Sequence, residues 1–393
     1  MKRLRVCAVS GGRADFGLLV PPMRAIAAHE RLELRLVATG MHLAPEFGRI
    51  IDAIRAEGFA VDEEVESQLA SDTGRGVAKS VGLGVIGFAD AFARIAPDMV
   101  LVLGDRFEIF AAAQAAMLMR IPIAHLCGGD VTEGAVDDCI RHAISKMAHL
   151  HFVTNTGAAA RLARMGEPAE RIVVSGSPGI DGLLAVEPAT RAEFEVQTGL
   201  RLAERNILVT FHPVTVAPGR TDAELSELIA ALAGLPQDIG VIVTRANADA
   251  EGRAVNARLE AFVAERAGAQ IVTSLGQRNY ARALGLVDAV VGNSSSGLYE
   301  APTLGVSTVD VGDRQKGRLR AASVFHAQPE RNAIGRAIAA AMARPRAPVE
   351  NPYGDGRAGE RIAEVLAGLE DARALLEKPF NDAREAGERD DGA

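Results

Sequence analysis

Short runs of apolar, β-branched residues alternate along the chain with longer stretches that have the spacing of amphipathic helices. This alternation is typical of parallel βαβ units. One helical stretch, Phe107 to Arg120, is apolar almost all round, as expected of a helix buried against a sheet. The strands expected in the first half are Leu4 to Ser10, Leu34 to Thr39, Met99 to Leu103, Ile121 to Leu126, Leu150 to Thr154 and Ile172 to Ser175.

The alternation stops after Gly182, where a stretch with Pro188 and many charges follows, and it restarts at Asn206. The second series predicts strands at Ile207 to Phe211, Val241 to Thr244, Ile271 to Thr273, Ala289 to Val291 and Thr308 to Val311, then helices near 331–343 and 357–369. We therefore predict an α/β protein of two Rossmann-like domains, residues 1–182 and 206–370. The charge-dense residues 371–393 are expected to form a mobile tail.

Composition narrows the range of partners. The chain has 393 residues, 48% hydrophobic and 24% charged, with a formal net charge of -8. No broad cationic surface is expected, so nucleic acid is a poor partner. Cys7, Cys127 and Cys139 form no CxxC pair, which fits a reducing compartment. No apolar run is long enough for a signal peptide or a membrane span, so we expect a cytoplasmic protein without a membrane partner.

Two motifs in the first half follow predicted strands. Ser10 to Asp15 (SGGRAD) joins a strand to a helix through two glycines, and Arg13 could bind phosphate oxygens. Such a turn also occurs for purely structural reasons. Asp105 and Arg106 follow the strand VLVL, at the carboxyl edge where open α/β sheets bind ligands. Asp105 could instead be a helix N-cap.

Titratable residues cluster after the next strand. His125, Cys127 and Asp130 are followed by Asp137, Asp138, Arg141 and His142 on the expected helix. Such clustering in loops favours a catalytic or binding role over a role in packing. The purely structural alternative for Asp137 and Arg141 is an ion pair between residues four apart on one helix. The spacing matches no standard zinc pattern, so no metal is expected.

The second half carries two comparable motifs. His212 ends the first strand of this half, although a lone histidine is usually structural. Residues 292–297 (GNSSSG) join a strand to a helix through small hydroxyl residues that can cradle phosphate, and Glu300 could accept hydrogen bonds from a ribose diol. A Ser-rich N-cap with a helix glutamate is the alternative.

Taken in order, the motifs SGGRADFG, GDRFE, GGDVTEGAVDDCIRHAISKMAH, FHPVT, GNSSSGLYEAP and GDRQKGR resemble those of the hydrolysing UDP-N-acetylglucosamine 2-epimerase family. The resemblance covers about residues 5–370. It implies the glycosyltransferase-B architecture, with a central cleft between two Rossmann-like domains. It also implies chemistry without a metal or other cofactor, a homo-oligomer (dimer or tetramer), and a role in making precursors of sialic and related acids.

The resemblance also assigns roles by position. It places Ser294 and Ser295 at the diphosphate of a nucleotide sugar and Glu300 on its ribose. The remaining binding positions it implies are Arg13, Arg106, Asp130, Arg141, Asn247 and Arg314, and the catalytic positions are Asp105, Asp137 and His212. Cys127 stands where animal members have glutamate, and Asp130 replaces a Glu, which leaves the group that removes the C2 proton open.

The expected reaction converts UDP-N-acetylglucosamine to N-acetylmannosamine and UDP, by elimination and hydration through a glycal. The alternative substrate is UDP- or GDP-N,N'-diacetylbacillosamine, as in legionaminic acid synthesis. A glycosyltransferase or a non-catalytic nucleotide-sugar binder are the remaining alternatives.

Overall fold

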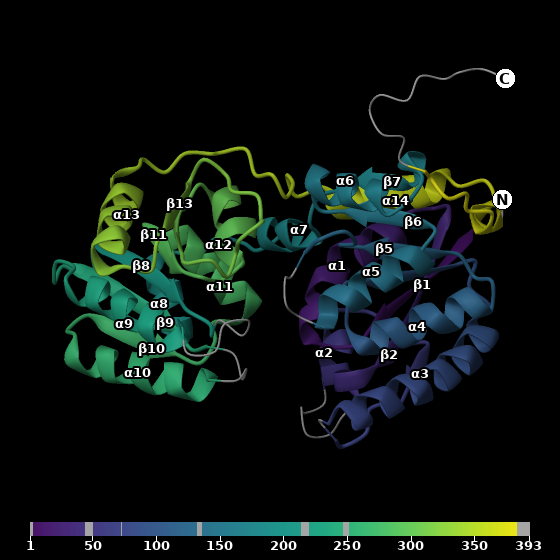
Figure 1. The fold of residues 1–393 in the computed structure, drawn as a ribbon, viewed down its shortest axis with the longest axis horizontal. Helices are drawn as coiled ribbons and strands as arrows, with labels where there is room; N and C mark the ends of the chain where they lie inside the picture. Colours follow the sequence, from purple (N-terminus) through teal and green to yellow (C-terminus); the bar gives the residue numbers. More distant parts are fainter. Residues whose placement is uncertain are drawn as a thin grey trace. The chain divides into compact units, whose positions relative to one another are not determined.

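The computed structural model describes residues 3–43, 50–71, 73–131, 136–213, 220–246 and 251–382. The chain divides into two compact units, the first made of residues 1–182 and 356–393 and the second of residues 183–355. Both consist of a parallel sheet with helices (Figure 1).

Seven described strands form the sheet of the first unit, in the order β3-β2-β1-β4-β5-β6-β7. All of their pairings are parallel. The strands are β1 Leu4–Ser10, β2 Leu32–Thr39, β3 Glu63–Val65, β4 Met99–Leu103, β5 Ile123–Leu126, β6 Leu150–Val153 and β7 Ile172–Val174. The helices are α1 Arg13–Ala28, α2 Ile50–Ala56, α3 Gly74–Ile95, α4 Phe107–Leu118, α5 Val136–Met147, α6 Thr156–Arg164 and α7 Pro178–Leu184.

The centre of this sheet is buried on both faces. Every residue of β4 is buried, which explains why its sequence, MVLVL, lacks the alternation of a half-exposed strand. Helix α4 contributes a row of buried alanines and lies close to α3, because a Cβ added at Gly84 would be 2.9 Å from the Ala111 Cβ. These small residues let the two helices pack tightly on the same side of the core.

The second unit has six described strands in the order β10-β9-β8-β11-β12-β13, again all parallel. They are β8 Arg205–Thr210, β9 Ile239–Thr244, β10 Ala269–Val272, β11 Ala289–Gly292, β12 Ser307–Val311 and β13 Val324–Ala327. The helices are α8 Arg191–Thr198, α9 Arg220–Ala233, α10 Gly252–Glu265, α11 Gly276–Leu286, α12 Ser296–Tyr299 and α13 Arg331–Ala343. The α/β class expected from the sequence is confirmed in both units.

The end of the chain differs from the sequence-based prediction. Helix α14 (Ala358–Gly368) was expected to close the second domain, but it packs on α1 in the first unit. A Cβ at Gly359 would lie 2.9 Å from the Pro21 backbone, and the Asp181 carboxylate accepts hydrogen bonds from the backbone N–H groups of Ala358 and Gly359. An amphipathic pattern shows which face a helix buries but not against which core, so the sequence could not assign this helix.

The expectation of a mobile tail from residue 371 is wrong for residues 371–382. The Lys378 ammonium donates to the backbone carbonyls of Lys146 and Ala148, both at 2.7 Å, and forms an ion pair with the buried Glu167 at 3.0 Å. Asn381 also bonds the backbone of Gly166. The many charged residues of this segment suggested that it is exposed, but the charge of Lys378 is paired with the buried Glu167. Residues 383–393 of the predicted tail lie outside the described residues.

Candidate functional site

Loops that follow neighbouring strands meet at the carboxyl edge of the first sheet. Strand β4 pairs with β1 on one side and with β5 on the other. The residues after these strands, 11–12, 104–106 and 127–131, therefore lie at one edge, where open α/β sheets bind ligands. The sequence placed its first group of site residues in these loops and at the starts of the helices that follow.

Asp105 and Arg141 form an ion pair at this edge. The guanidinium of Arg141, on α5, donates to the Asp105 carboxylate and, at 2.9 Å, to the backbone carbonyl of Asp130. The Asp138 carboxylate is 3.5 Å away from the same guanidinium. Arg141 thus connects the loops after β4 and β5 and holds the Asp105 carboxylate in place.

The pKa of Asp105 is raised above its ordinary value, chiefly because burial disfavours the charged form. The positive charge of Arg141 opposes this shift, and the negative charge of Asp137 adds to it. Asp137 is exposed on the first turn of α5. Asp105 is not the N-cap of α4, because Arg106 occupies that position. The capping alternative for Asp105 is therefore wrong.

Arg106 is held by acidic neighbours. Its guanidinium makes two bonds to the buried Glu108 carboxylate, at 2.8 and 3.2 Å, and lies 3.7 Å from Asp15. Burial raises the pKa of Asp15 to about 7, although the charge of Arg106 lowers it. Asp15 lies within the SGGRAD motif and Glu108 within the GDRFE motif, but neither motif predicted a role for these two residues.

Cys127 has a backbone φ of 61°, an unusual value for a non-glycine residue, and a partly buried side chain that packs against the core of the first unit. Burial raises the pKa of its thiol, and the nearby Asp130 carboxylate raises it further. The thiol is therefore neutral at physiological pH, which makes it a poor proton acceptor. Asp130 accepts a hydrogen bond from the Thr154 hydroxyl at 2.9 Å, which ties this loop to the end of β6.

His125 of the same cluster is buried, and both of its ring nitrogens contact polar groups of the protein. Its Nε2 lies 2.8 Å from the Gly104 carbonyl and its Nδ1 lies 3.1 Å from the Ser145 hydroxyl. Burial lowers the pKa of the imidazole to about 3. Within the part of the chain that the structure describes, no group of three His, Cys, Asp or Glu side chains is arranged to hold a metal ion.

The second group of predicted residues surrounds the carboxyl ends of β8 and β11, which pair in parallel. The Asn293 amide bonds both backbone groups of His212, accepting from its N–H at 2.7 Å and donating to its carbonyl at 2.9 Å. The backbone carbonyl of Asn293 in turn accepts hydrogen bonds from the Arg314 guanidinium at 3.1 Å and from the Gln315 side-chain amide at 2.8 Å. Asn293, which carried no predicted role, therefore links His212 to Arg314.

The serine-rich turn is built on Gly292. This residue has a φ of 134°, and a Cβ there would lie 1.9 Å from the Thr210 carbonyl, so only glycine fits. The Ser294 and Ser296 hydroxyls lie 3.1 Å apart, and Tyr280 donates to Ser296 at 2.6 Å. The turn thus presents a fixed set of hydroxyl groups.

Glu300 directly follows the short helix α12 as its C-cap residue, and it does not take part in an N-terminal capping box, because the N-cap Ser295 makes no side-chain capping bond. The capping alternative for this motif is therefore wrong. Burial raises the pKa of the Glu300 carboxyl to about 7. A carboxyl group with this pKa is about half ionised near neutral pH, and only its ionised form is a pure hydrogen-bond acceptor.

The predicted residues fall into one group per unit. Asp105, Arg106, Asp130 and Arg141 lie together in the first unit with the start of α5, and His212, Ser294, Ser295, Glu300 and Arg314 lie in the second. Arg13 begins α1, but its side chain is outside the described part. Asn247 also lies outside the described residues.

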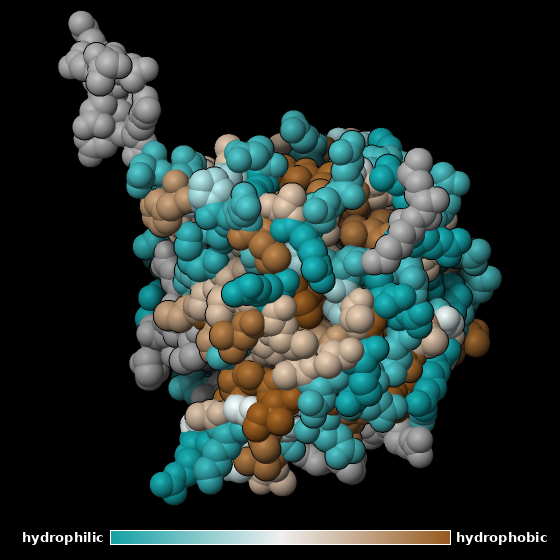
Figure 2. All heavy atoms as spheres, turned by 90° about the vertical axis from the view of Figure 1, so that its right-hand side faces the viewer, coloured by the Kyte–Doolittle hydropathy of each residue, from teal (hydrophilic) through white to brown (hydrophobic). Residues whose placement is uncertain are grey.

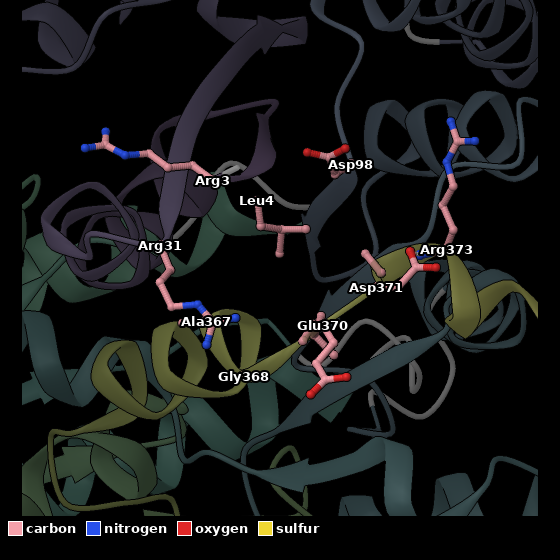
Figure 3. A pocket seen from close by; sticks show the side chains of 11 residues that line it. Arg3, Leu4, Arg31, Asp98, Ala367, Gly368, Glu370, Asp371 and Arg373 are labelled. Atoms are coloured by element: carbon pink, nitrogen blue, oxygen red, sulfur yellow. Dashed lines mark hydrogen bonds between the residues drawn. The ribbon is translucent and has the colours of Figure 1, made fainter. Parts of the chain in front are cut away.

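One polar pocket lies elsewhere in the first unit (Figure 3). Its walls include Arg3, Arg31 and Asp98, at the amino ends of the strands, together with residues 367–373, which run from the end of α14 into the segment that follows it. It encloses about 790 Å³. Since the predicted site residues follow the carboxyl ends of the strands, this pocket is separate from them.

The model of one protein family, UDP-N-acetylglucosamine 2-epimerase, matches residues 24–367. The chain belongs to this family of enzymes. The family resemblance seen in the motifs is thereby confirmed.

Three similar proteins also carry names of 2-epimerases. The chain is 36% identical over 329 residues to the hydrolysing GDP/UDP-N,N'-diacetylbacillosamine 2-epimerase of Campylobacter jejuni, covering 84% of this chain and 85% of that protein. It is 33% identical to the hydrolysing UDP-N,N'-diacetylbacillosamine 2-epimerase of Legionella pneumophila, and the match covers 92% of this chain and 95% of that protein. It is 32% identical to a UDP-N-acetylglucosamine 2-epimerase of Neisseria meningitidis, and the match covers 96% of this chain and 99% of that protein.

Solved structures of 2-epimerases share this fold. A crystal structure of UDP-GlcNAc 2-epimerase from Neisseria meningitidis bound to UDP-GlcNAc matches with a TM-score of 0.76 at 18% identity, covering 92% of this chain and 99% of that one. The structural similarity agrees with the two parallel α/β units described above.

Proposed function

We propose that the protein is a hydrolysing 2-epimerase that releases UDP from a nucleotide-linked 2-acetamido sugar and inverts carbon 2. The observation that carries the proposal is the Asp105 carboxylate. It lies at the carboxyl edge of the first sheet, where it is half-buried and held by Arg141, and its pKa is raised. A carboxylate with a raised pKa in a fixed position is suited to remove a weakly acidic C–H proton.

The proposed reaction has two stages. Asp105 takes the proton from C2 while the C1–O bond to the diphosphate breaks, and the electron pair of the C–H bond forms the double bond of a glycal. Water then adds across the double bond, with a proton delivered to the opposite face of C2. The hydroxyl of this water bonds to C1, and the exposed Asp137, whose charge acts on Asp105, takes the water's proton and passes it to C2. Asp105 then returns its own proton to solvent.

The leaving diphosphate gathers negative charge as the C1–O bond breaks, and positive or hydrogen-bonding groups stabilise this charge. We assign this task to Arg13, Arg106 and His212, with the Ser294 and Ser295 hydroxyls. The two-pronged bond to Glu108 orients the Arg106 side chain. Glu300 is assigned to the ribose diol, because a carboxylate accepts two hydroxyl donors.

For the sugar we propose N,N'-diacetylbacillosamine in preference to N-acetylglucosamine. The support is the identity to the Campylobacter and Legionella enzymes named for that substrate, 36% and 33%. N-acetylglucosamine is the second candidate, because the Neisseria relative named for it is 32% identical over 381 residues.

The test compares release of UDP from the two UDP sugars, with the product sugar identified by chromatography against standards. We expect a higher kcat/KM for UDP-N,N'-diacetylbacillosamine, a product that is the free 2-epimer, and unchanged rates in EDTA. A higher kcat/KM for UDP-N-acetylglucosamine would reverse the assignment of the sugar. UDP release that depends on a second, acceptor sugar would instead show a glycosyltransferase, and binding without turnover would show a nucleotide-sugar binder.

A further inference from the structure

The segment between α13 and α14, residues 344–357, contains no helix or strand. Irregular segments of about this length are uncommon in compact domains and often carry a function. Tyr353 is the only residue of this segment that is buried, with 1% of its surface exposed. Apolar and polar side chains are intermingled on the face of the molecule in Figure 2, so an exposed apolar side chain is ordinary in this protein. A polar-tipped side chain that an irregular segment carries inside is more informative.

The Tyr353 ring stacks on the Tyr299 ring. The two ring centres are 3.7 Å apart and the ring planes differ by 19°. Tyr299 is the last residue of α12 and directly precedes Glu300, the residue that we assign to the ribose. Aromatic pairs have a preferred geometry, so each ring restricts the orientation of the other. The Tyr353 ring therefore restrains the end of the short helix that presents Glu300.

The Tyr353 hydroxyl reaches a second part of the same unit. It donates a hydrogen bond to the backbone carbonyl of Leu319 at 3.2 Å. Leu319 belongs to the loop after β12 that begins at Gly312 and carries Arg314. The Leu319 side chain is 41% exposed, so its own burial does not anchor the loop. The hydroxyl of Tyr353 provides such an anchor.

Asn351 fixes the backbone from which Tyr353 extends. Its side-chain amide donates to the Tyr299 carbonyl and to the Thr303 hydroxyl, both at 2.7 Å, and its side-chain oxygen accepts from the Tyr353 N–H at 3.0 Å. Two residues of the irregular segment thus hold α12 through both the backbone and the ring of Tyr299.

The loop and α12 are also linked to each other. The Arg318 guanidinium lies 5.6 Å from the centre of the Tyr299 ring and donates to the Gln315 side chain at 2.7 Å. Gln315 in turn bonds the backbone carbonyl of Asn293, next to the serine-rich turn. Tyr353 therefore belongs to one network of contacts that includes the neighbours of Glu300, of Arg314 and of the serines.

We propose that Tyr353 is a positioning residue for nucleotide binding, which acts through Tyr299 on Glu300 and through Leu319 on the loop that carries Arg314. The inference rests on the proposed function, which assigns Glu300 to the ribose. Because these groups are remote from the reacting carbon, disturbing them removes binding that substrate and transition state share. Replacement of Tyr353 should therefore raise KM more than it lowers kcat.

The test measures the dissociation constant for UDP by titration calorimetry of the full chain, together with kcat and KM. Tyr353→Leu removes the ring stack and the hydroxyl and should raise the dissociation constant about tenfold, the effect of losing an aromatic pair and one hydrogen bond. Tyr353→Phe keeps the ring and loses the hydroxyl alone, so it should raise the constant by less, about threefold. In both variants kcat should stay within about twofold of the wild type.

Phe262→Leu is the matched control. Phe262 is a buried aromatic residue near the end of α10, in the apolar core of the same unit. Its replacement should lower the melting temperature, measured by circular dichroism, but leave the dissociation constant for UDP unchanged. Tyr353 variants that melt earlier but bind UDP as tightly as the wild type would show a structural role only and overturn the proposal. An equal loss of UDP affinity in Phe262→Leu would also overturn it.

Two further outcomes separate this inference from the proposed function. If Tyr353→Leu does not fold, an unchanged dissociation constant in Tyr353→Phe overturns the inference by itself. A wild type that binds UDP but epimerises neither UDP sugar, with weaker UDP binding in the Tyr353 variants, supports the inference and contradicts the proposed function. A wild type that epimerises a UDP sugar, with UDP affinity unchanged in the Tyr353 variants, does the reverse, and a wild type that does not bind UDP overturns both.

Discussion

Replacing Arg141 by Gln should move the acidic limb of the pH profile of kcat/KM to higher pH. Arg141 donates directly to the Asp105 carboxylate, and its charge lowers a pKa that burial raises. An adjacent opposite charge lowers a carboxyl pKa by about 1 to 3 units. Because the Asp105 side chain is 20% exposed and Arg106 also acts on it, we take the low end, about one unit or roughly 1.4 kcal/mol.

The sign follows from the role of Asp105 as a base. A base works only when it is deprotonated, so raising its pKa leaves less active enzyme at low pH and little change above the new pKa. The Gln variant should therefore lose about tenfold more activity on the acidic side than on the alkaline side. The assay is the initial rate of UDP release measured across the pH range in buffers of constant ionic strength.

Arg141→Lys is the matched control. It keeps the positive charge but loses the planar guanidinium, which donates to the Asp105 carboxylate and to the Asp130 carbonyl from two different nitrogens. The acidic limb of its kcat/KM profile should stay close to that of the wild type. Its rate should fall if the guanidinium also positions the Asp105 carboxylate. A limb that does not move in the Gln variant, or that moves to lower pH, would refute the view that Asp105 is the base and that Arg141 controls its charge. Equal shifts in both variants would show that position rather than charge sets the limb.

The remaining predictions concern the proton acceptor and the nucleotide. Asp105→Asn keeps the shape but removes the basic oxygen, so kcat should fall on the order of a hundredfold or more, while Cys127→Ser should keep substantial turnover because its thiol is neutral. Single-turnover kinetics measure both, and the reverse pattern would assign the proton to the cysteine. Glu300→Ala should raise KM more than it lowers kcat, since it removes a contact remote from the reacting carbon. With a Glu300 pKa of about 7, UDP affinity should fall as the pH drops through neutrality, and calorimetry would disprove this role if Glu300→Ala kept the same affinity and pH dependence.

The sequence predicted the central strands well because their apolar runs reflect burial on both faces. The bounds of β1 and β4 agree with the expected Leu4 to Ser10 and Met99 to Leu103. Strands β3 and β13, at the edges of their sheets, were missed. Strand β3 is only three residues long and contains two glutamates, and the β13 sequence, VFHA, is too short to show a period.

The candidate site was predictable where a motif follows a strand, and less so where residues act through others. Asp105 and Arg106 were found from their place after β4, but the partner of Asp105 is Arg141, 36 residues later, and no local spacing indicates that pair. The sequence offered an i,i+4 pair with Asp137 as the alternative for Arg141. Asn293, which bonds both backbone groups of His212, could be found only from the parallel pairing of β8 and β11.

Proton NMR of the reaction in heavy water tests the central claim most directly. We predict that UDP-N,N'-diacetylbacillosamine or UDP-N-acetylglucosamine is converted to free UDP and the free 2-epimer, with one deuterium at C2 of the product and none elsewhere on the ring. Asp105→Asn should slow the appearance of that deuterium and the release of UDP together. A released sugar that keeps both its original configuration and its C2 proton would contradict the account, because C1–O cleavage would then proceed without proton removal at C2.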